Sequence, residues 1–556
     1  MKSLHLILAA LLFICLSLKA EEQICERVYV HTDKDCYIAG EDILLKFYVV
    51  DNHFQPSNLS KVGYVEICST EKPLLQLKVA LEKGGGSGKI EISEDIPSGI
   101  YQLSGYTRYM RNEGENVFFK KQIAVVNAGQ QIPDPKRFEL VDKDEINYPV
   151  KKEPADFLIT TGQNEYGNRR KVSLSIDNIP DNTANLVVSV SRNDSIIPLP
   201  ELNNREWLKQ AAESFPFSQQ WIPEYEGHII TGRFVPEPQE ELLSSVAFLG
   251  NDIRIFDGQA NSLDNTVNYY TTKMFGKQQI VTSAISLYYD KVPYRIDLLT
   301  PFCESLPKNL PVLQIYYNEE QILERYIGAQ IQKRVKDDTI DEIIYTPENW
   351  ISQPILSYDL DEYTRFTTVG ETILEFINRV RVTRMGDKRR ISVYMGDEQR
   401  YSQRTLVLLD GIPVYDHEDM LGYNPMYIKR INIYEDRYTF GGNDFDCIIS
   451  FVTREHNLPF FQLSSESQLL NYDFPQLPPT FVAPDYSIDS VRNSRKPDFR
   501  HTLYWNPSVE STTDRPVNLS FYTSDLCGEF KVTVEGITTD GKMLHSVSYF
   551  QVTSDE

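Results

Sequence analysis

The fold of the N-terminal part of this chain is decided by the stretch Val28-Tyr-Val-His-Thr-Asp-Lys-Asp-Cys-Tyr-Ile-Ala-Gly-Glu-Asp-Ile-Leu-Leu-Lys-Phe-Tyr-Val-Val50. Runs rich in β-branched and aromatic residues stand at its two ends, and Asp, Lys and Gly residues that favour turns lie between them. A further run, Tyr64-Val-Glu-Ile67, follows after another break. Short strands at this spacing predict a β-sandwich.

The same pattern recurs along the chain. Lys171 to Val190 contains two cleanly alternating runs, Val-Ser-Leu-Ser-Ile and Asn-Leu-Val-Val-Ser-Val, and these predict a second sandwich. Helical spacing is found at Glu201 to Ser214 and in a segment that begins near Asn318. The expected fold class is therefore mainly β, a multidomain chain of immunoglobulin-like sandwiches with few helices.

Two motifs near the N-terminus carry a family resemblance. Thr32-Asp-Lys34, Tyr37 and Gly40-Glu41 precede an apolar run, and Pro97-Ser-Gly-Ile-Tyr-Gln-Leu103 comes later. Both are similar to motifs of the second macroglobulin domain (MG2) of the α2-macroglobulin family. The resemblance covers about residues 26–127 and implies a macroglobulin-like β-sandwich.

The C-terminal part carries a related resemblance. Phe499 to Pro507, Leu519 to Asp525 and Phe530 to Gly536 are similar to a segment shared across the α2-macroglobulin family. The resemblance implies a small sandwich, or a strand set that completes an earlier one. The thioester sequence Gly-Cys-Gly-Glu-Gln of macroglobulin inhibitors is absent from the chain, which excludes covalent protease trapping.

A different order of motifs fills Thr405 to Thr453. An apolar run ends in Asp410-Gly411-Ile-Pro413, a second run follows Asn424-Pro425, and a third ends at Thr453-Arg454. This order resembles the plug domain of TonB-dependent receptors, and Glu371 to Val380 resembles the first helix of that domain. The resemblance implies a small α+β domain. Residues 456–556 are too few for the about 22 strands of a plugged barrel, so we expect no transport pore from this chain.

Together these patterns predict a domain order. The predicted order is a signal peptide (1–20), an MG2-like sandwich (21–128), a linker (129–154), a second sandwich with an inserted helix (155–222), a third β domain that resembles a carboxypeptidase regulatory-like domain (223–305), a helical connector (306–354), the plug-like domain (355–455), a linker (456–498) and the C-terminal macroglobulin-like segment (499–556).

The glycine-rich run Gly84-Gly-Gly-Ser-Gly-Lys89 is not a phosphate-binding loop. A Walker loop needs a glycine where Lys83 stands in this spacing and a Ser or Thr where Ile90 stands. We expect a flexible hairpin connection between strands at 77–81 and 90–92.

The composition of the chain indicates in which compartment we expect the protein and which partners its charge argues against. Lys2 followed by an apolar stretch from Leu4 to Leu18 predicts a cleaved secretory signal. No later stretch is long and apolar enough for a spanning helix. The net charge of −23 argues against nucleic acid as a partner. Because plug-like domains belong to Gram-negative bacteria, we expect the periplasm or a periplasm-facing position at the outer membrane.

Six cysteines follow the predicted signal peptide, at 25, 36, 68, 303, 447 and 527. They form no C-x-x-C pair, so the spacing predicts neither a zinc site nor a thioredoxin-like site. A disulfide from Cys36 to Cys25 or to Cys68 and a set of buried free thiols are alternatives that the sequence leaves open.

Few residues are candidates for chemistry. Asp416-His417-Glu418-Asp419 concentrates metal-capable side chains, but four consecutive residues cannot all face one ion, so we expect a solvated loop. His228 stands beside Glu226, a spacing that would suit a base and its orienting carboxylate, although a structural role is expected in a β-rich segment. Asp410 and Gly411, followed by Pro413, predict a tight structural turn. No catalytic residue, cofactor or metal is expected.

The sequence therefore favours a non-enzymatic cell-envelope accessory protein that binds a periplasmic or outer-membrane protein, for which a β-barrel is one candidate. Sandwiches have edge strands that can accept a strand of a partner. Two alternatives stay open: an envelope hydrolase, acting on peptides or glycans, with its site between domains, and a protease-binding protein that resembles macroglobulins and lacks the thioester.

Overall fold

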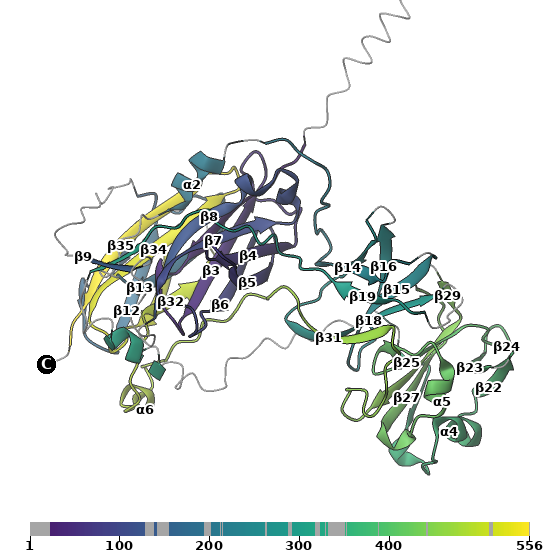
Figure 1. Cartoon of the computed structure of the whole chain (residues 1–556). Helices are drawn as coiled ribbons and strands as arrows, with labels where there is room; N and C mark the ends of the chain where they lie inside the picture. The colour runs from purple at the N-terminus through teal and green to yellow at the C-terminus, as the bar shows by residue number, and fades with distance from the viewer. Residues whose placement is uncertain are drawn as a thin grey trace, which may run out of the picture. The chain divides into compact units, whose positions relative to one another are not determined.

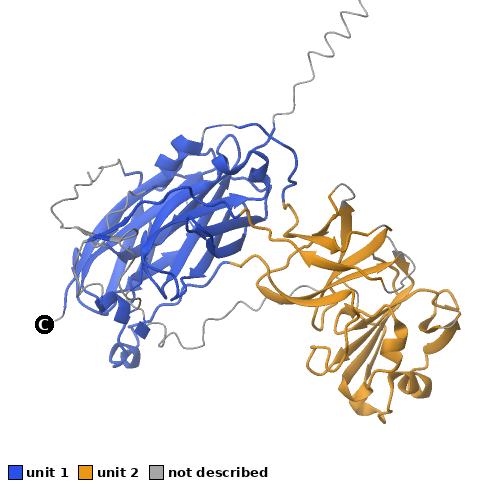
Figure 2. Ribbon diagram, in the orientation of Figure 1, with its two compact units in different colours: residues 1–223, 304–341, 478–556 blue, residues 224–303, 342–477 orange. Residues whose placement is uncertain are grey.

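A computed structural model describes residues 23–127, 138–141, 155–193, 202–211, 213, 215–238, 240–261, 264–286, 292–316, 323–328, 330–331, 351, 353–386, 388–440, 443–510 and 515–554 (Figure 1). The chain is mainly β, with 46% strand and 10% helix. It divides into two compact units, residues 1–223, 304–341 and 478–556 in the first and residues 224–303 and 342–477 in the second (Figure 2). The predicted signal peptide lies outside the described residues.

The N-terminal β-sandwich of the first unit has two sheets. One has the order β1-β3-β6, from Arg27–Thr32, Asp42–Val50 and Gly85–Glu91, and the other has the order β2-β8-β7-β4-β5, from Cys36–Ile38, Phe119–Val126, Gly99–Thr107, Val62–Cys68 and Pro73–Ala80. The short 3₁₀ helices η1 (Tyr109–Asn112) and η2 (Glu115–Val117) precede β8. Residues 27–126 thus form one sandwich, within the range of the MG2 resemblance.

Alternation along β1 explains why all of this strand is buried. Val28 and Val30 pack over Gly105 of the opposite sheet, so they belong to the core of their own sandwich. Tyr29 and His31 point to the other face, where they contact Glu535 of the C-terminal segment. Because the side chains of a strand alternate between its two faces, β1 contacts the core of its own sandwich with one face and the C-terminal segment with the other.

The glycine-rich run is a strand, and the prediction of a flexible connection there was wrong. Gly85–Glu91 forms β6 and pairs antiparallel with β3. A Cβ at Gly86 would lie 2.5 Å from the carbonyl oxygen of Ala80, so only glycine allows this close backbone approach. The glycines permit tight packing, which sequence reasoning mistook for flexibility.

The second sandwich of the first unit combines two distant parts of the chain. One sheet has the order β10-β12-β33, from Leu158–Thr161, Lys171–Asp177 and Val517–Tyr522, and the other has the order β11-β35-β34-β13-β32, from Glu165–Tyr166, Met543–Val552, Gly528–Thr538, Thr183–Arg192 and Thr502–Asn506. One core joins both sheets. The predicted domain 155–222 is therefore not self-contained, because its central strand β13 pairs with β34 and β32.

Short elements pack around these sandwiches. Helix α2 (Asn204–Ala211) lies in the predicted helical segment and buries Trp207. Strand β9 (Phe138–Val141), in the predicted linker 129–154, pairs in parallel with β20 (Leu313–Tyr316) of the predicted connector. Residues 323–328 are helical, and α6 (Asp489–Arg492) follows in the C-terminal part. Among the residues described, no helix is long and apolar enough to cross a membrane.

The cysteine alternatives are resolved, since Cys25, Cys36 and Cys68 are free thiols, as are the other three. Burial raises the pKa of Cys36 to about 11. The buried thiol is therefore neutral at physiological pH and packs as a small apolar side chain.

The first sheet of the second unit has seven strands. Its order is β19-β14-β17-β16-β15-β18-β31, from Arg295–Leu298, Ile229–Val235, Thr266–Tyr270, Ile255–Asn261, Leu242–Phe248, Lys277–Ser286 and Ser467–Asp473. Strand β31 comes from the predicted linker 456–498, so that prediction was wrong for these residues. The alternation of Leu470 and Tyr472 with exposed neighbours buries one face of β31 on the core of this sheet.

The other sheets of the second unit belong to residues 355–455. A mixed sheet has the order β21-β27-β30-β25-β26, from Leu356–Asp359, Ile428–Tyr434, Cys447–Thr453, Thr405–Leu409 and Ile412–Pro413, and two smaller sheets consist of β22 (Val380–Met385), β23 (Lys388–Met395) and β24 (Arg400–Tyr401), and of β28 (Tyr438–Phe440) and β29 (Asn443–Phe445). The helices are η3 (Leu360–Glu362), α4 (Val369–Phe376), α5 (His417–Leu421) and η4 (Pro425–Tyr427). Helix α4 ends before Val380, where the predicted helix ended, because β22 begins there. The α+β character expected here is present.

Candidate functional site

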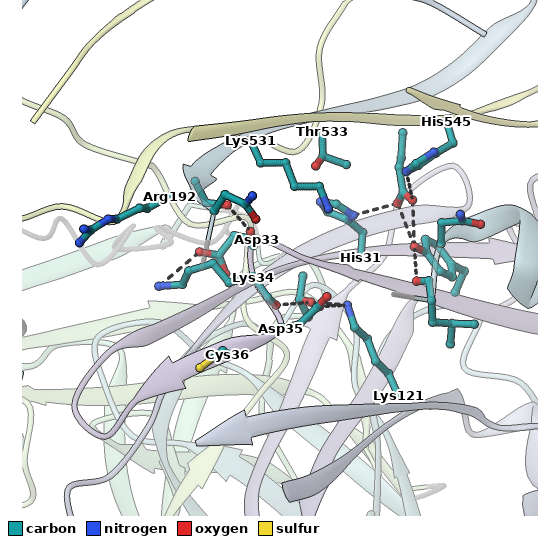
Figure 3. Close-up of a pocket in the computed structure, with 17 residues that line it drawn as sticks. His31, Asp33, Lys34, Asp35, Cys36, Lys121, Arg192, Lys531, Thr533 and His545 are labelled. Atoms are coloured by element: carbon teal, nitrogen blue, oxygen red, sulfur yellow. Dashed lines mark hydrogen bonds and ion pairs between the residues drawn. The ribbon is translucent and has the colours of Figure 1, made fainter. Parts of the chain in front are cut away.

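A polar cavity of about 210 Å³ lies between the two sandwiches of the first unit (Figure 3). Strands β1 and β8 contribute His31 and Lys121 from the first sandwich, while β34 and β35 contribute Glu535 and His545 from the second. Charged side chains of both signs face one another there, so their pairing decides whether the cavity has free groups for chemistry.

Glu535 is the centre of this network. Its side chain is buried, the Tyr29 hydroxyl donates to it at 2.9 Å, and Nδ1 of His31 lies 2.8 Å from a carboxylate oxygen. Burial alone would raise the pKa of Glu535, but its interactions with His31 and His545 and the Tyr29 hydrogen bond outweigh burial and lower this pKa to about 2. Glu535 is therefore ionised at neutral pH.

Two more carboxylates near the cavity are paired. Nζ of Lys121 lies 2.5 Å from Asp35 and also donates to the Thr32 hydroxyl at 2.8 Å. Asp33 accepts a hydrogen bond of 2.6 Å from the Thr502 hydroxyl, which lies on β32 of the other sandwich. The Thr502–Asp33 contact joins the two sandwiches, as the Tyr29–Glu535 contact does, whereas the Lys121 contacts lie within the N-terminal sandwich. We interpret the network as a structural connection between the sandwiches.

The side chains of the acidic cluster Asp416 to Asp419 have different partners and do not converge on one point. The Asp416 carboxylate accepts from the Glu418 amide and caps α5, while Glu418 pairs with Arg389 at 2.6 Å. His417 accepts a hydrogen bond from the Ile391 amide at 3.0 Å, and burial followed by the charge of Arg390 lowers its pKa to about 4. Within the described residues, no group of three or more metal-capable side chains comes together. The loop expected at His417 to Asp419 is instead the helix α5.

His228 pairs with Glu224. The sequence had suggested Glu226 as its partner, and that expectation was wrong. Its Nδ1 lies 2.9 Å from Glu224 and its Nε2 lies 2.7 Å from the hydroxyl of Tyr472. The side chains of His228 and Glu224 are fully buried. Because Tyr472 belongs to β31, this relay fastens the last strand of the seven-stranded sheet, which is a structural role.

The turn at Asp410 and Gly411 connects β25 to β26, which ends at Pro413. The φ angles are +47° at Asp410 and +82° at Gly411, a left-handed conformation that Asp and Gly tolerate. The Asp410 carboxylate also accepts from the amide and hydroxyl of Thr453 and from the Leu458 amide, at 2.6 to 3.0 Å. Sequence reasoning found the turn but not this buried anchor.

Strand β31 ends the seven-stranded sheet, and no described strand pairs with its outer edge. The Ala284 amide donates to the Glu466 carbonyl and the Phe474 amide donates to the Gly276 carbonyl, which fixes the antiparallel hydrogen-bond pattern. In this pattern the backbone groups of Leu469 and Asn471 point away from β18. They are the groups that a further strand would meet.

The other edges of the two large sheets of this unit are protected. Strands β19 and β21 have four residues each, β26 has two, and β19 carries Arg295 and Asp297. By contrast, β31 has seven residues without proline or a basic side chain, and Leu469 is 45% exposed. Natural proteins usually shorten, charge or cover their edge strands, because an exposed edge can pair with another chain.

Sequence reasoning missed β31 because Ser467 to Asp473 lies between proline-containing segments. The available signal was the alternation of Leu470 and Tyr472 with polar residues, which is short and has no turn partner beside it. Its pairing with β18, almost two hundred positions earlier, has no local signature.

No family model matches the chain, and no curated protein matches it. Among solved structures, trypsin-activated α2-macroglobulin from Escherichia coli is 9% identical, with 96% of this chain and 42% of that chain covered at a TM-score of 0.25. Salmonella α2-macroglobulin reacted with methylamine is 9% identical, with 95% and 39% covered at a TM-score of 0.23. Dimeric latent PorU from Porphyromonas gingivalis is 7% identical, with 96% and 34% covered at a TM-score of 0.14.

These similarities do not assign the chain to a family. The chain spans about two fifths of the length of the macroglobulins it is similar to. None of the three neighbours is a plug domain, and the plug-like resemblance of residues 355–455 stays a prediction.

Proposed function

We propose that this protein is a non-enzymatic binding protein of the cell envelope, which takes an extended segment of a protein partner on the outer edge of β31. The observation that carries the proposal is the seven-residue open edge at β31, where Leu469 and Asn471 direct backbone groups outward. Main-chain hydrogen bonds supply affinity in strand addition, and the side chains beside them supply specificity.

Two buried polar networks support a binding role, because each holds parts of the fold together. The network around Glu535 joins two sandwiches, and the relay through His228 fastens β31. Periplasmic or periplasm-facing localisation rests on the leader-like sequence from Met1 to Ala20. An outer-membrane protein is accordingly one class of partner.

The test uses a photo-crosslinking amino acid at Leu469, with the same group at Leu374 as the control. Leu374 is 81% exposed on α4 of the same unit. We expect Leu469 to crosslink to one envelope protein through an extended peptide, which mass spectrometry of the linked fragments identifies. Equal crosslinking from Leu374, or no crosslink from Leu469, would contradict the proposal.

A matched pair of substitutions separates backbone pairing from side-chain contact. Asn471→Pro removes an outward donor while the hydrogen bonds to β18 stay in place, because the inward donors belong to neighbouring residues. Asn471→Ala removes the same side chain, including its hydrogen bond with Gln279, and keeps the donor. The crosslink should disappear in the proline variant and persist in the alanine variant.

A further inference from the structure

A basic segment stands out on this acidic chain. Eight arginine and lysine residues and three acidic ones lie between Arg379 and Arg404, whereas the whole chain has a net charge of −23. Five of these cations belong to the hairpin of β22 and β23, which we name the basic hairpin: Arg381, Arg384, Lys388, Arg389 and Arg390. Four of them are exposed, and Arg390 is half-buried.

The register of the hairpin places like charges together. Arg384 on β22 stands directly opposite Arg389 on β23. Like charges at directly opposed positions of a sheet are destabilising. Glu418 offsets part of this repulsion, since the charges of Arg389 and Arg384 both lower its pKa, and an external anion would offset more of it.

Internal carboxylates neutralise only part of the charge. Arg389 pairs with Glu418 at 2.6 Å, and Arg381 stacks on the ring of Tyr401 with its guanidinium 3.4 Å from the centroid. None of the ion pairs within the described residues joins Arg384 or Arg390 to a carboxylate at 4 Å or less, although the charge of Arg384, like that of Arg389, lowers the pKa of Glu418. Their guanidinium groups are the surplus positive charge of the basic hairpin.

The hairpin also has an edge for backbone pairing. Strand β22 ends its sheet, and the Tyr394 amide donates to the Arg379 carbonyl at 2.7 Å, which fixes the alternation of hydrogen bonds. In this pattern the backbone groups of Val382 and Arg384 point away from β23. An extended segment laid along β22 would meet backbone donors and guanidinium groups together.

We propose that the basic hairpin binds an acidic, extended segment of a protein partner. Charge complementarity selects carboxylates, and planar guanidinium groups bind carboxylates through paired hydrogen bonds. The negative charge of the rest of the chain repels nucleic acid and anionic membranes, which are large polyanions, but a short acidic segment meets only the local field. The proposal rests on the binding function proposed above and gives the chemistry of a second surface for a partner.

Fluorescence anisotropy of the purified full chain tests the proposal, with a labelled peptide of about ten Glu residues. Arg384 and Arg390 lie on opposite faces of the hairpin, and a strand of consecutive Glu residues presents carboxylates on both of its faces. The double variant Arg384→Gln, Arg390→Gln removes the surplus charges and keeps the Arg389–Glu418 pair. The control Lys120→Gln, Arg233→Gln removes two exposed cations elsewhere. We expect binding to weaken about tenfold in the first variant and by less than about twofold in the control.

Several outcomes would overturn the proposal. These are no binding of the peptide, equal weakening in both double variants, or tighter binding of phosphatidylglycerol vesicles or a single-stranded oligonucleotide than of the peptide. Circular dichroism checks that each variant is folded, and the single variant Arg384→Gln repeats the measurement with the smallest change. Asn471→Pro should keep the peptide affinity, so a failure at β31 and a failure at the basic hairpin are distinguished.

Discussion

Tyr29 and Glu535 stand 506 positions apart in the chain, and the hydroxyl of Tyr29 donates a hydrogen bond of 2.9 Å to the carboxylate of Glu535. The contact crosses from β1 of one sandwich to β34 of the other. Both side chains are buried, so this bond and its neighbours decide how firmly the N-terminal sandwich is joined to the C-terminal segment.

Removing the hydroxyl tests this connection. We expect Tyr29→Phe to lower the free energy of unfolding by about 1.5 to 3 kcal/mol, because a hydrogen bond to a charged, buried acceptor is lost. Urea denaturation of the full chain measures the effect. Tyr225→Phe, at a side chain that is 56% exposed, is the control and should change stability by less than about 0.5 kcal/mol. Equal effects of the two substitutions would contradict the role of Tyr29.

The lowered pKa of the Glu535 carboxylate leads us to expect that the stability of the protein depends on pH. Because the pKa of Glu535 is lowered to about 2 in the folded protein, its contribution is fully present above the ordinary glutamate pKa. That contribution is lost as pH falls through about 4.3, the unfolded value, towards 2. We expect the wild-type protein to lose more stability over this window than Glu535→Gln, as measured by denaturation at a series of pH values. Parallel pH profiles would exclude Glu535 as a contributor.

Substitution of Asp410 tests whether this tight turn needs the charge of the carboxylate or only a residue that tolerates the backbone conformation. Asn tolerates the φ of +47° at this position, so Asp410→Asn keeps the turn but weakens the hydrogen bonds from Thr453 and Leu458. We expect a loss of about 1 to 3 kcal/mol, measured by thermal or urea unfolding. Asp416→Asn is the control, since it changes a half-buried helix cap and should cost less. A neutral effect of Asp410→Asn would show that the turn alone holds this segment.

How much of this structure the sequence predicts depends on how far apart in the chain the interacting residues lie. The alternation in β1 and β3, and the Asp410-Gly411 turn, follow from neighbouring residues, so local patterns were sufficient for the mainly β class and for that turn. The partner of Tyr29 and the partner of β31 come from distant parts of the chain, and no local pattern encodes them. His228 illustrates the difference, since its neighbour Glu226 was the predicted partner and Glu224, four positions before His228, is the observed one.

Gly86 shows that a glycine can be required without a turn. We expect Gly86→Ala to destabilise the N-terminal sandwich by about 1 to 3 kcal/mol, because the new Cβ would lie 2.5 Å from the Ala80 carbonyl oxygen. The control is Gly162→Ala, where the nearest neighbour of a Cβ, the Tyr166 hydroxyl oxygen, is 3.6 Å away. Differential scanning calorimetry compares the two variants. A lower midpoint for Gly162→Ala than for Gly86→Ala would contradict the close packing of β6.

The relay from Glu224 through His228 to Tyr472 gives a prediction for the open edge itself. His228→Phe keeps an aromatic ring but removes both hydrogen bonds, so Glu224 loses one of its donors and the hydroxyl of Tyr472 loses its partner in the relay. We expect faster hydrogen–deuterium exchange at Gln468 and Leu470, whose amides point to β18, because β31 is held less firmly. Tyr472→Phe should have a smaller effect, since the His228–Glu224 pair stays. If the relay acts as a unit, Tyr472→Phe should add little in the His228→Phe background, and a double-mutant cycle measures that coupling. Unchanged exchange in β31 with a loss of global stability would assign His228 to the core of the sheet and not to the support of its edge.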